Sequence, residues 1–232
     1  MQFPSNWKEK ELNEKVNDWN FDPFVETPEY LHLVLRKLFE PFLEKFRINL
    51  KTFYNFSRKS EYFYSRAGNP YHNFYHGVAV THSGFHLLRS LECFEDILDD
   101  SLKFAFIIGC FGHDLDHRGT NNPFQISTRS RLAIRYHDES PLERHHAAVL
   151  FNIILNLAGD KSKLLPNGEY IGEDDCNILK AFDKEEFQKL RKYIIEIILA
   201  TDMKFHFELL GSFNFRKVPR QTQQKRCFRK QH

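Results

Sequence analysis

The sequence predicts an all-α protein, built as a compact multi-helix domain. Apolar residues recur at helical spacing over most of residues 28–210, and no segment of useful length alternates apolar and polar residues as a strand would. Turn signals such as Ala67-Gly68-Asn69-Pro70 separate the helical segments. Helices without strands bury their apolar faces against one another, so we expect one helical core. The 24 phenylalanines either make this core rich in aromatic rings or reflect codon bias.

The first two helices are expected at residues 28–47 and 49–64. Thr27 is suited to cap the first helix, and Pro28 fits its first position because the first turn leaves its N–H groups unpaired. The apolar residues of this segment fall on one face. Pro41 lies inside the segment and predicts a kink or a break there.

Four more helices are expected, at about residues 73–91, 102–111, 138–158 and 184–210. The segment 102–111 is very apolar and follows the capping sequence Asp99-Asp100-Ser101, so we expect it to be a central element of the core. Loops are expected at residues 118–123 and 160–172, where polar residues, glycine and proline gather.

Charge and composition divide the chain into three parts. Residues 1–27 form an N-terminal extension, residues 28–210 the helical domain, and residues 211–232 a basic tail. The tail holds no acidic residue and is expected to be disordered. Its basic residues are Arg216, Lys217, Arg220, Lys225, Arg226, Arg229 and Lys230.

Charge, cysteine content and targeting signals limit the cellular compartment and the kinds of partner that we expect for this protein. The formal net charge of +2 gives no general argument for binding nucleic acid or a membrane surface. The four cysteines form no C-x-x-C pair and no disulfide framework, which favours reduced thiols inside the cell. No secretory signal and no apolar stretch of about 20 residues is visible. We expect an intracellular, cytoplasmic protein that reaches a membrane only through partners.

Histidines and acidic residues gather in three clusters of the chain. His72 and His76 are four residues apart and share one face if the segment is helical. The second cluster is the segment 113–117, and the third is the segment 143–146. Neutral imidazoles and carboxylates together suit zinc and a harder second ion such as magnesium.

The adjacent residues His113 and Asp114 suit a site with two metals. The histidine can hold one ion while the carboxylate, with its two oxygens, bridges to the second. Two bridged metals can share a water, lower its pKa and stabilise charge on a phosphoryl group. Each cluster alone is a weak signal, because histidine pairs are more often structural or exposed. Their joint presence on helices that flank an apolar core favours a metal site.

Four motifs resemble those of the class I cyclic-nucleotide phosphodiesterases, in the same order and with similar spacing. The resemblance covers about residues 28–210 and implies an all-α, HD-type phosphodiesterase domain. The motifs are Tyr71-His72-Asn73-x-x-His76, His113-Asp114-Leu115-Asp116-His117-Arg118-Gly119-x-x-Asn122, Leu142-Glu143-x-His145-His146 and Ala200-Thr201-Asp202-Met203.

The resemblance implies a role for each matched residue. His72 is expected to be the general acid that protonates the leaving 3′ oxygen. Two divalent metals per domain are implied, zinc with magnesium or manganese. The implied zinc ligands are His76, His113 and Asp114, with Asp114 bridging to the second metal. Residues implied to hold metal-bound waters are His117, Glu143, His146 and Thr201, and those implied to line the nucleotide pocket are Tyr71 and Met203.

The implied reaction is hydrolysis of cAMP, cGMP or both to the 5′-monophosphate by a hydroxide that two metals activate. The sequence departs from the family in two places. Ala79 stands where an aspartate or another polar residue is common. The family's catalytic domain also continues past the last motif, with a further aspartate ligand of zinc, a glutamine and an aromatic residue that contact the purine. The chain therefore reads as truncated at its C-terminal end.

Two alternatives to an active cyclic-nucleotide phosphodiesterase remain open for a truncated chain. One is an inactive phosphodiesterase fragment that binds metal or a partner protein. The other is an HD-type metal phosphohydrolase for a different nucleotide, which would not explain the motifs that contain Tyr71 and Met203. Apolar faces on residues 102–111 and 184–199 are expected to be exposed by the truncation, and the chain could self-associate through them. The small-molecule partner expected is a cyclic nucleotide, with no nucleic acid.

Overall fold

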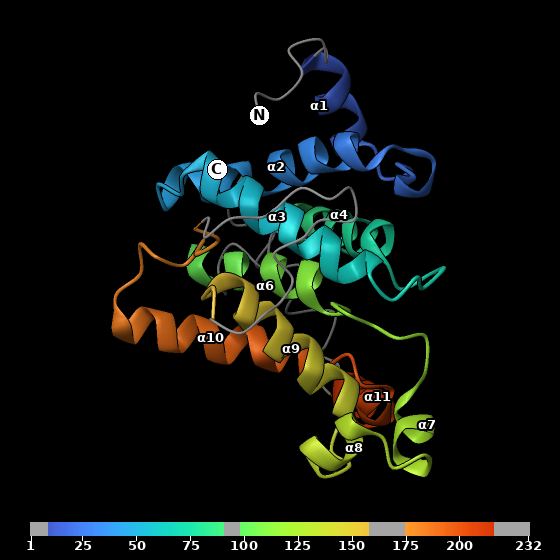
Figure 1. Ribbon diagram of the computed structural model, residues 1–232. Coiled ribbons are helices and arrows are strands. Elements are labelled where there is room, and N and C mark those ends of the chain that lie inside the picture. The colour runs from blue at the N-terminus through green and yellow to red at the C-terminus, as the bar shows by residue number, and fades with distance from the viewer. Residues whose placement is uncertain (1–8, 91–97, 158–174, 216–232) are drawn as a thin grey trace. The chain divides into compact units, whose positions relative to one another are not determined.

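The computed structural model describes residues 9–90, 98–157 and 175–215, and the side chains among these up to residue 212 (Figure 1). The described residues form helices and no strand, which confirms the all-α prediction. The chain divides into two compact units, residues 1–199 and 200–232.

The first unit contains nine described α-helices and one short 3₁₀ helix. In chain order they are α1 (Glu9–Asn17), η1 (Pro23–Val25), α2 (Pro28–Lys45), α3 (Leu50–Ser65), α4 (Phe74–Ser90), α6 (Asp100–Gly112), α7 (Asn122–Ser127), α8 (Arg131–Tyr136), α9 (Pro141–Ile154) and α10 (Lys184–Leu199). The second unit contains η2 (Met203–Phe205) and α11 (His206–Phe215).

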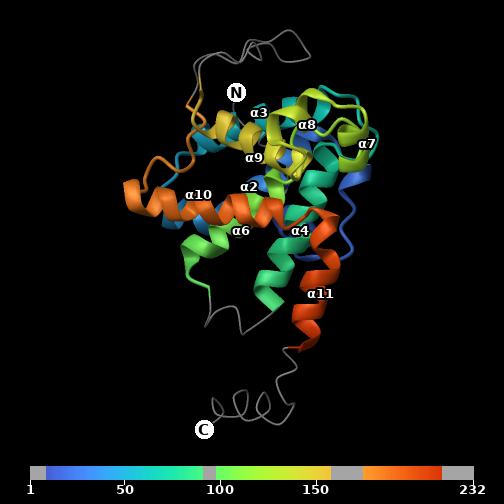
Figure 2. The ribbon, with the colours of Figure 1, turned by 90° about the horizontal axis from the view of Figure 1, so that it is seen from below.

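Helix α6 is the central element of the first unit. It packs against α2, α4, α9 and α10, and Figure 2 shows α10 lying along it. Asp99 caps α6 by accepting a hydrogen bond from the Leu102 N–H, as the sequence predicted. From Phe104 to Gly112 every residue except Phe106 is buried. The position of α6 matters for function because its C-terminal end leads directly into the histidine-rich segment 113–117.

The core of the first unit is rich in aromatic rings. The Phe39 ring lies 5.0 Å from that of Phe53 and 6.3 Å from those of Phe104 and Phe111, measured between ring centroids. All four side chains are buried. Rings at such distances and at steep angles pack edge to face, which adds to the stabilisation from burial alone.

Helices α6 and α10 approach closely at a glycine. A Cβ atom at Gly109 would lie 2.6 Å from Ile197 Cγ2. The apolar faces of α6 and α10 therefore cover each other, and the prediction that both faces would be exposed is wrong for most of their length. Self-association of the chain stays a prediction.

Three of the predicted elements differ from the structure. Helix α2 runs through Pro41, so the proline does not end it. The segment predicted as one helix at 138–158 is α9 alone, because His137, Asp138 and Ser140 adopt positive φ angles between α8 and α9. The predicted helix 184–210 ends at Leu199. Asp202 then starts η2, and its carboxylate accepts a hydrogen bond from the Lys204 N–H.

The N-terminal segment is part of the first unit. Leu12 and Val16 of α1 are buried within the same apolar cluster as the residues of α2 and α6. The predicted domain boundaries stay predictions, and the predicted loop 160–172 and tail beyond residue 215 lie outside the described residues. Among the described helices, none combines the length and the apolar character that crossing a membrane requires.

Candidate metal centre

Three side chains meet where the first turn of α4 faces the end of α6. The Nε2 atoms of His76 and His113 are 3.2 Å apart, and Asp114 Oδ2 lies 3.3 Å from His76 Nε2 and 3.2 Å from His113 Nε2. Ligand atoms around a tetrahedral zinc are about 3.3 Å apart, because each bond is about 2.0 Å long. The three atoms therefore have the spacing of one face of a zinc site.

Hydrogen bonding determines which ring nitrogen of His113 carries a proton. His113 Nδ1 lies 2.9 Å from the carbonyl oxygen of Cys110, and a carbonyl oxygen can only accept. Nδ1–H therefore donates, and in the neutral ring Nε2 presents its lone pair toward Asp114. Two lone pairs at 3.2 Å repel each other, whereas a cation between them would bind both. The geometry thus fits a metal ion.

Asp114 also belongs to a second group of potential ligands, with His117 and His146. His146 Nδ1 lies 2.6 Å from the carbonyl oxygen of Leu115, so this nitrogen also donates and Nε2 is free to accept. His146 Nε2 lies 3.7 Å from Asp114 Oδ1. Since Oδ2 faces the first group and Oδ1 faces the second, the Asp114 carboxylate lies between them.

His117 has the opposite proton arrangement. Its Nδ1 accepts a hydrogen bond of 3.0 Å from the Gly119 N–H and lies 3.1 Å from the side-chain amide nitrogen of Asn69. In the neutral ring the proton therefore resides on Nε2. The ring of His72 stacks on that of His117, with centroids 4.1 Å apart. His72 is thus held next to the centre without itself belonging to either group of ligands.

Electrostatics favour ionised Asp114 within the centre. Burial alone would raise the pKa of this carboxyl, but its polar contacts with the His113 and His76 imidazoles outweigh it and hold the pKa well below its usual range. Burial lowers the pKa of the His113 imidazole, and the interaction with Asp114 outweighs that effect and raises it. The carboxylate is therefore charged at any physiological pH, as a metal ligand must be.

Burial favours the neutral form of three further imidazoles, those of His72, His117 and His146. Burial lowers the pKa of His146 to about 3, although Asp114 acts in the opposite direction. The pKa values of His72 and His117 are also lowered by burial, again against the effect of Asp114. Neutral imidazoles offer a lone pair or a single N–H, which suits contact with a metal or with a water that a metal holds.

The sequence comparison identifies the family. The model of the 3′,5′-cyclic nucleotide phosphodiesterase family matches residues 71–232, which includes the basic segment after residue 210. The chain belongs to this family. The phosphodiesterase regA of Dictyostelium discoideum is 32% identical over 213 residues, which are 91% of this chain and 24% of regA. The dual 3′,5′-cyclic-AMP and -GMP phosphodiesterase beta of Plasmodium falciparum is 38% identical over 64% of this chain and 11% of the relative.

Solved phosphodiesterase domains share the fold. The phosphodiesterase domain of the RhoPDE fusion protein from the choanoflagellate Salpingoeca rosetta superposes with a TM-score of 0.74 and is 33% identical. The superposition covers 89% of this chain and 59% of the solved domain. The chain therefore spans about a quarter of the length of regA and about three fifths of the solved domain.

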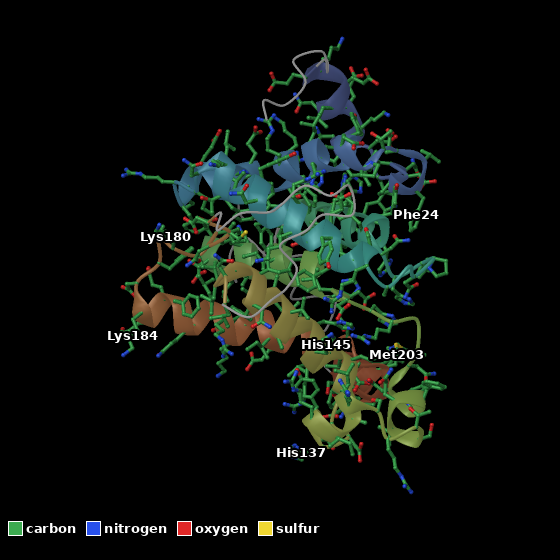
Figure 3. All side chains as sticks on the ribbon, in the orientation of Figure 1. Phe24, His137, His145, Lys180, Lys184 and Met203 are labelled. Carbon is green, nitrogen blue, oxygen red and sulfur yellow. The ribbon has the colours of Figure 1, made fainter. Side chains whose placement is uncertain are left out.

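The sequence analysis did not predict an ionic network beside the candidate metal centre. Asp116 accepts hydrogen bonds from Arg66 Nε and Nη2, at 2.7 and 2.6 Å, and is 2.7 Å from His145 Nε2. Burial would raise the pKa of Asp116, but the bonds from His145 and Arg66 lower it to about 2. His145 lies on α9 (Figure 3). No sequence signal marked Arg66, whereas His145 and Asp116 were in the motifs without a role.

Two asparagines hold other parts of the site. Asn69 Oδ1 accepts hydrogen bonds from the backbone N–H groups of Tyr71 and His72, while its amide nitrogen contacts His117. Asn122 Nδ2 donates to Glu143 Oε2 at 2.8 Å, and Asn122 Oδ1 accepts from the Leu142 N–H. Asn69 was part of the predicted turn, and its placement shows that this turn also orients the candidate acid.

The structure brings together most of the predicted site residues. The assembled set is His72, His76, His113, Asp114, His117 and His146, and Glu143 lies on α9 one turn before His146. Tyr71 is exposed, with its ring centroid 4.9 Å from that of His76. Thr201 and Met203 belong to the second unit, so their predicted roles stay predictions.

Proposed function

We propose that the chain hydrolyses 3′,5′-cyclic nucleotides to 5′-monophosphates at the centre around Asp114. The observation that carries the proposal is the shared carboxylate, since Oδ2 faces His76 and His113 while Oδ1 faces His146. Membership of the phosphodiesterase family supports the same reaction. Because relatives include a protein named for both cyclic AMP and cyclic GMP, we propose both nucleotides as substrates to be tested.

In this proposal His76, His113 and Asp114 would hold zinc, and Asp114 would also contribute to holding a second ion, magnesium or manganese. When bound, such a metal pair lowers the pKa of water and neutralises charge on a phosphate. The donor set fits, because two neutral imidazoles and a carboxylate suit zinc and carboxylate oxygen suits the harder ion. His117, Glu143, His146 and Thr201 would contribute by hydrogen bonding to waters of the site.

His72 is the proposed general acid. Cleavage of the cyclic diester releases the 3′ oxygen as an alkoxide, which needs a proton. Burial lowers the pKa of His72, which makes its protonated form a stronger acid although a smaller fraction is protonated at neutral pH. Stacking on His117 and the backbone bonds that Asn69 accepts hold the ring in one place. Tyr71 and Met203 are proposed to contact the base of the nucleotide.

Hydrolysis of cyclic AMP and cyclic GMP by the purified chain, with zinc and magnesium or manganese added, tests the proposal. The variant His72→Gln should lower kcat by a factor of roughly 100 or more, because general acid catalysis contributes about that much. The matched control is His137→Asn, because His137 is exposed and lies outside the centre. His113→Ala should reduce both bound metal and turnover.

Turnover that is equal in the chain and in His72→Gln would reject the proposed role of His72. No turnover by a folded, metal-loaded sample would reject hydrolysis by this chain and favour a protein that binds metal or a partner without catalysis. The folded state in each case is checked by circular dichroism.

A further inference from the structure

A second pair of histidines on α4 meets the end of α1. His82 and His86 are four residues apart, and their Nε2 atoms are 3.2 Å from each other. Each Nε2 lies 3.1 Å from the backbone carbonyl oxygen of Val16. The three atoms form a nearly equilateral triangle, whose edges differ by at most about 0.2 Å from those of the triangle of His76, His113 and Asp114.

No arrangement of ring protons makes all three contacts of this triangle favourable. If both Nε2 atoms carry hydrogen, the contact between His82 and His86 brings two donors together. If only one carries hydrogen, the other Nε2 faces the Val16 oxygen as two acceptors. If neither does, all three contacts are between acceptors. Adding a proton to Nδ1 changes none of these cases, because only the Nε2 atoms and the carbonyl oxygen meet.

A cation just above the plane of the triangle removes the conflict, since two lone pairs and a carbonyl oxygen would all be directed toward it. The geometry points to a second metal site, formed by His82 Nε2, His86 Nε2 and the Val16 carbonyl oxygen, for a divalent transition metal such as zinc. Imidazole nitrogens are common ligands of zinc, copper and nickel, and histidines four apart on a helix present two nitrogens on one face.

The end of α1 adds to the attraction for a cation. Val16 is the second-last residue of α1, and its carbonyl is one of those at the C-terminal end of a helix that have no partner within the helix. The helix dipole is negative there. Asp18 follows Val16 by two residues. Its negative charge acts to raise the pKa of His82, so it favours a positive charge near that ring. Solvent would supply the remaining ligands.

Aromatic rings surround the pair. The Trp19 ring lies edge-on to His86 with centroids 5.5 Å apart, and the Phe21 ring lies 5.3 Å from that of His82. His82 is buried and His86 is partly exposed, which leaves a route for a metal ion to enter. Apolar neighbours of this kind limit the access of water that would compete for the metal, and they fix the orientation of the two imidazole rings.

The site is separate from the centre around Asp114. His82 and His86 follow His76 by six and ten residues on α4, which is about 9 and 15 Å along the axis and about 120° and 80° around it. A metal bound here would connect the end of α1 to the middle of α4, across more than 60 residues of sequence. Binding of this metal would therefore affect how firmly α1 is attached to α4.

The test is zinc content after equilibrium dialysis of the full chain against micromolar zinc. The variant His86→Gln should bind one equivalent less than the unchanged chain, and His137→Asn should bind the same amount as the unchanged chain. His86 is suited for substitution because it is the more exposed of the two ligands. Equal zinc content in folded His86→Gln and the unchanged chain would overturn the inference.

A second measurement does not depend on whether His86→Gln folds. Zinc should slow amide hydrogen exchange in residues 9–20 by a factor of about 10 in the unchanged chain. His113→Ala should keep this response, because it removes a ligand of the other centre only. Exchange in residues 9–20 that does not respond to zinc would overturn the inference, and loss of the response in folded His113→Ala would assign the effect to the centre around Asp114.

Discussion

Arg66 and Asp116 are joined by two parallel hydrogen bonds although 50 residues separate them in the sequence. The Asp116 side chain is almost fully buried, and its backbone has a positive φ of 62°. The two bonds therefore attach the segment that carries His113, Asp114 and His117 to the end of α3. A guanidinium can make such a fork with a carboxylate, whereas an ammonium cannot.

Replacing Arg66 with methionine should destabilise the protein by about 2 kcal/mol, because it leaves a buried carboxylate with fewer donors. Urea unfolding at pH 7 measures the change. Arg118→Met is the matched control, since Arg118 Nη2 is 3.8 Å from Asp116 and its side chain is 59% exposed. The control should change stability by less than about 0.5 kcal/mol. Equal losses for the two variants would contradict the special role of Arg66.

Replacing Gly109 with alanine should separate α6 from α10. The new Cβ would lie 2.6 Å from Ile197 Cγ2, so the helices must shift or Ile197 must change its conformation. Overpacking of this kind costs about 1–3 kcal/mol. Ile197→Ala removes the closest atom, so the double variant should be more stable than the sum of the two single losses predicts. Additive losses, measured by thermal unfolding, would show that the contact does not limit the packing.

The helices and the histidine-rich clusters could be recognised from the sequence because their signals are local. Asp99, Thr27 and the apolar periodicity marked the helix starts, and the resemblance to the phosphodiesterase motifs implied the ligand set His76, His113 and Asp114, which stays a prediction. The ends of helices were harder to predict. Leu199 ends α10 although the apolar pattern continues, because the capping carboxylate of Asp202 starts a new turn. Pro41 lies within α2 because tertiary packing outweighs the loss of one hydrogen bond.

The contacts that were not predictable join residues far apart in the chain. Nothing near Arg66 indicates that it faces Asp116, and nothing near His82 indicates that it meets Val16. The structure shows His82 buried against the end of α1, a contact that depends on the fold of the N-terminal segment.

The stability of the metal-free protein should fall as the pH is lowered from about 6.5 to about 4. Burial, with a further contribution from His86, lowers the pKa of His82 to about 4, against the effects of Val16 and Asp18. Between these pH values His82 is protonated to a greater extent in the unfolded chain than in the folded chain. Lowering the pH therefore reduces the free energy of unfolding over this range. His82→Gln should lose about 2 kcal/mol of this pH dependence, measured by urea unfolding with a chelator present. An unchanged pH dependence in His82→Gln would assign it to other groups.

Replacing Asn69 with aspartate should change the pH profile of hydrolysis, if the proposed function holds. In the unchanged chain His117 Nδ1 accepts from the Gly119 N–H and contacts the Asn69 amide, so Nε2 keeps its proton. A carboxylate at position 69 favours a proton on Nδ1. At low pH the His117 ring of this variant then carries a proton on each nitrogen, and at higher pH it loses the proton on Nε2. We expect kcat to fall about 10- to 100-fold at pH 8 and much less at pH 6.

Asn152→Asp is the control for the Asn69→Asp variant, because Asn152 is exposed on α9 and the charge change is the same. A uniform loss at both pH values would mean that Asn69 only supports the turn at Tyr71 and His72, and does not determine where the proton of His117 resides.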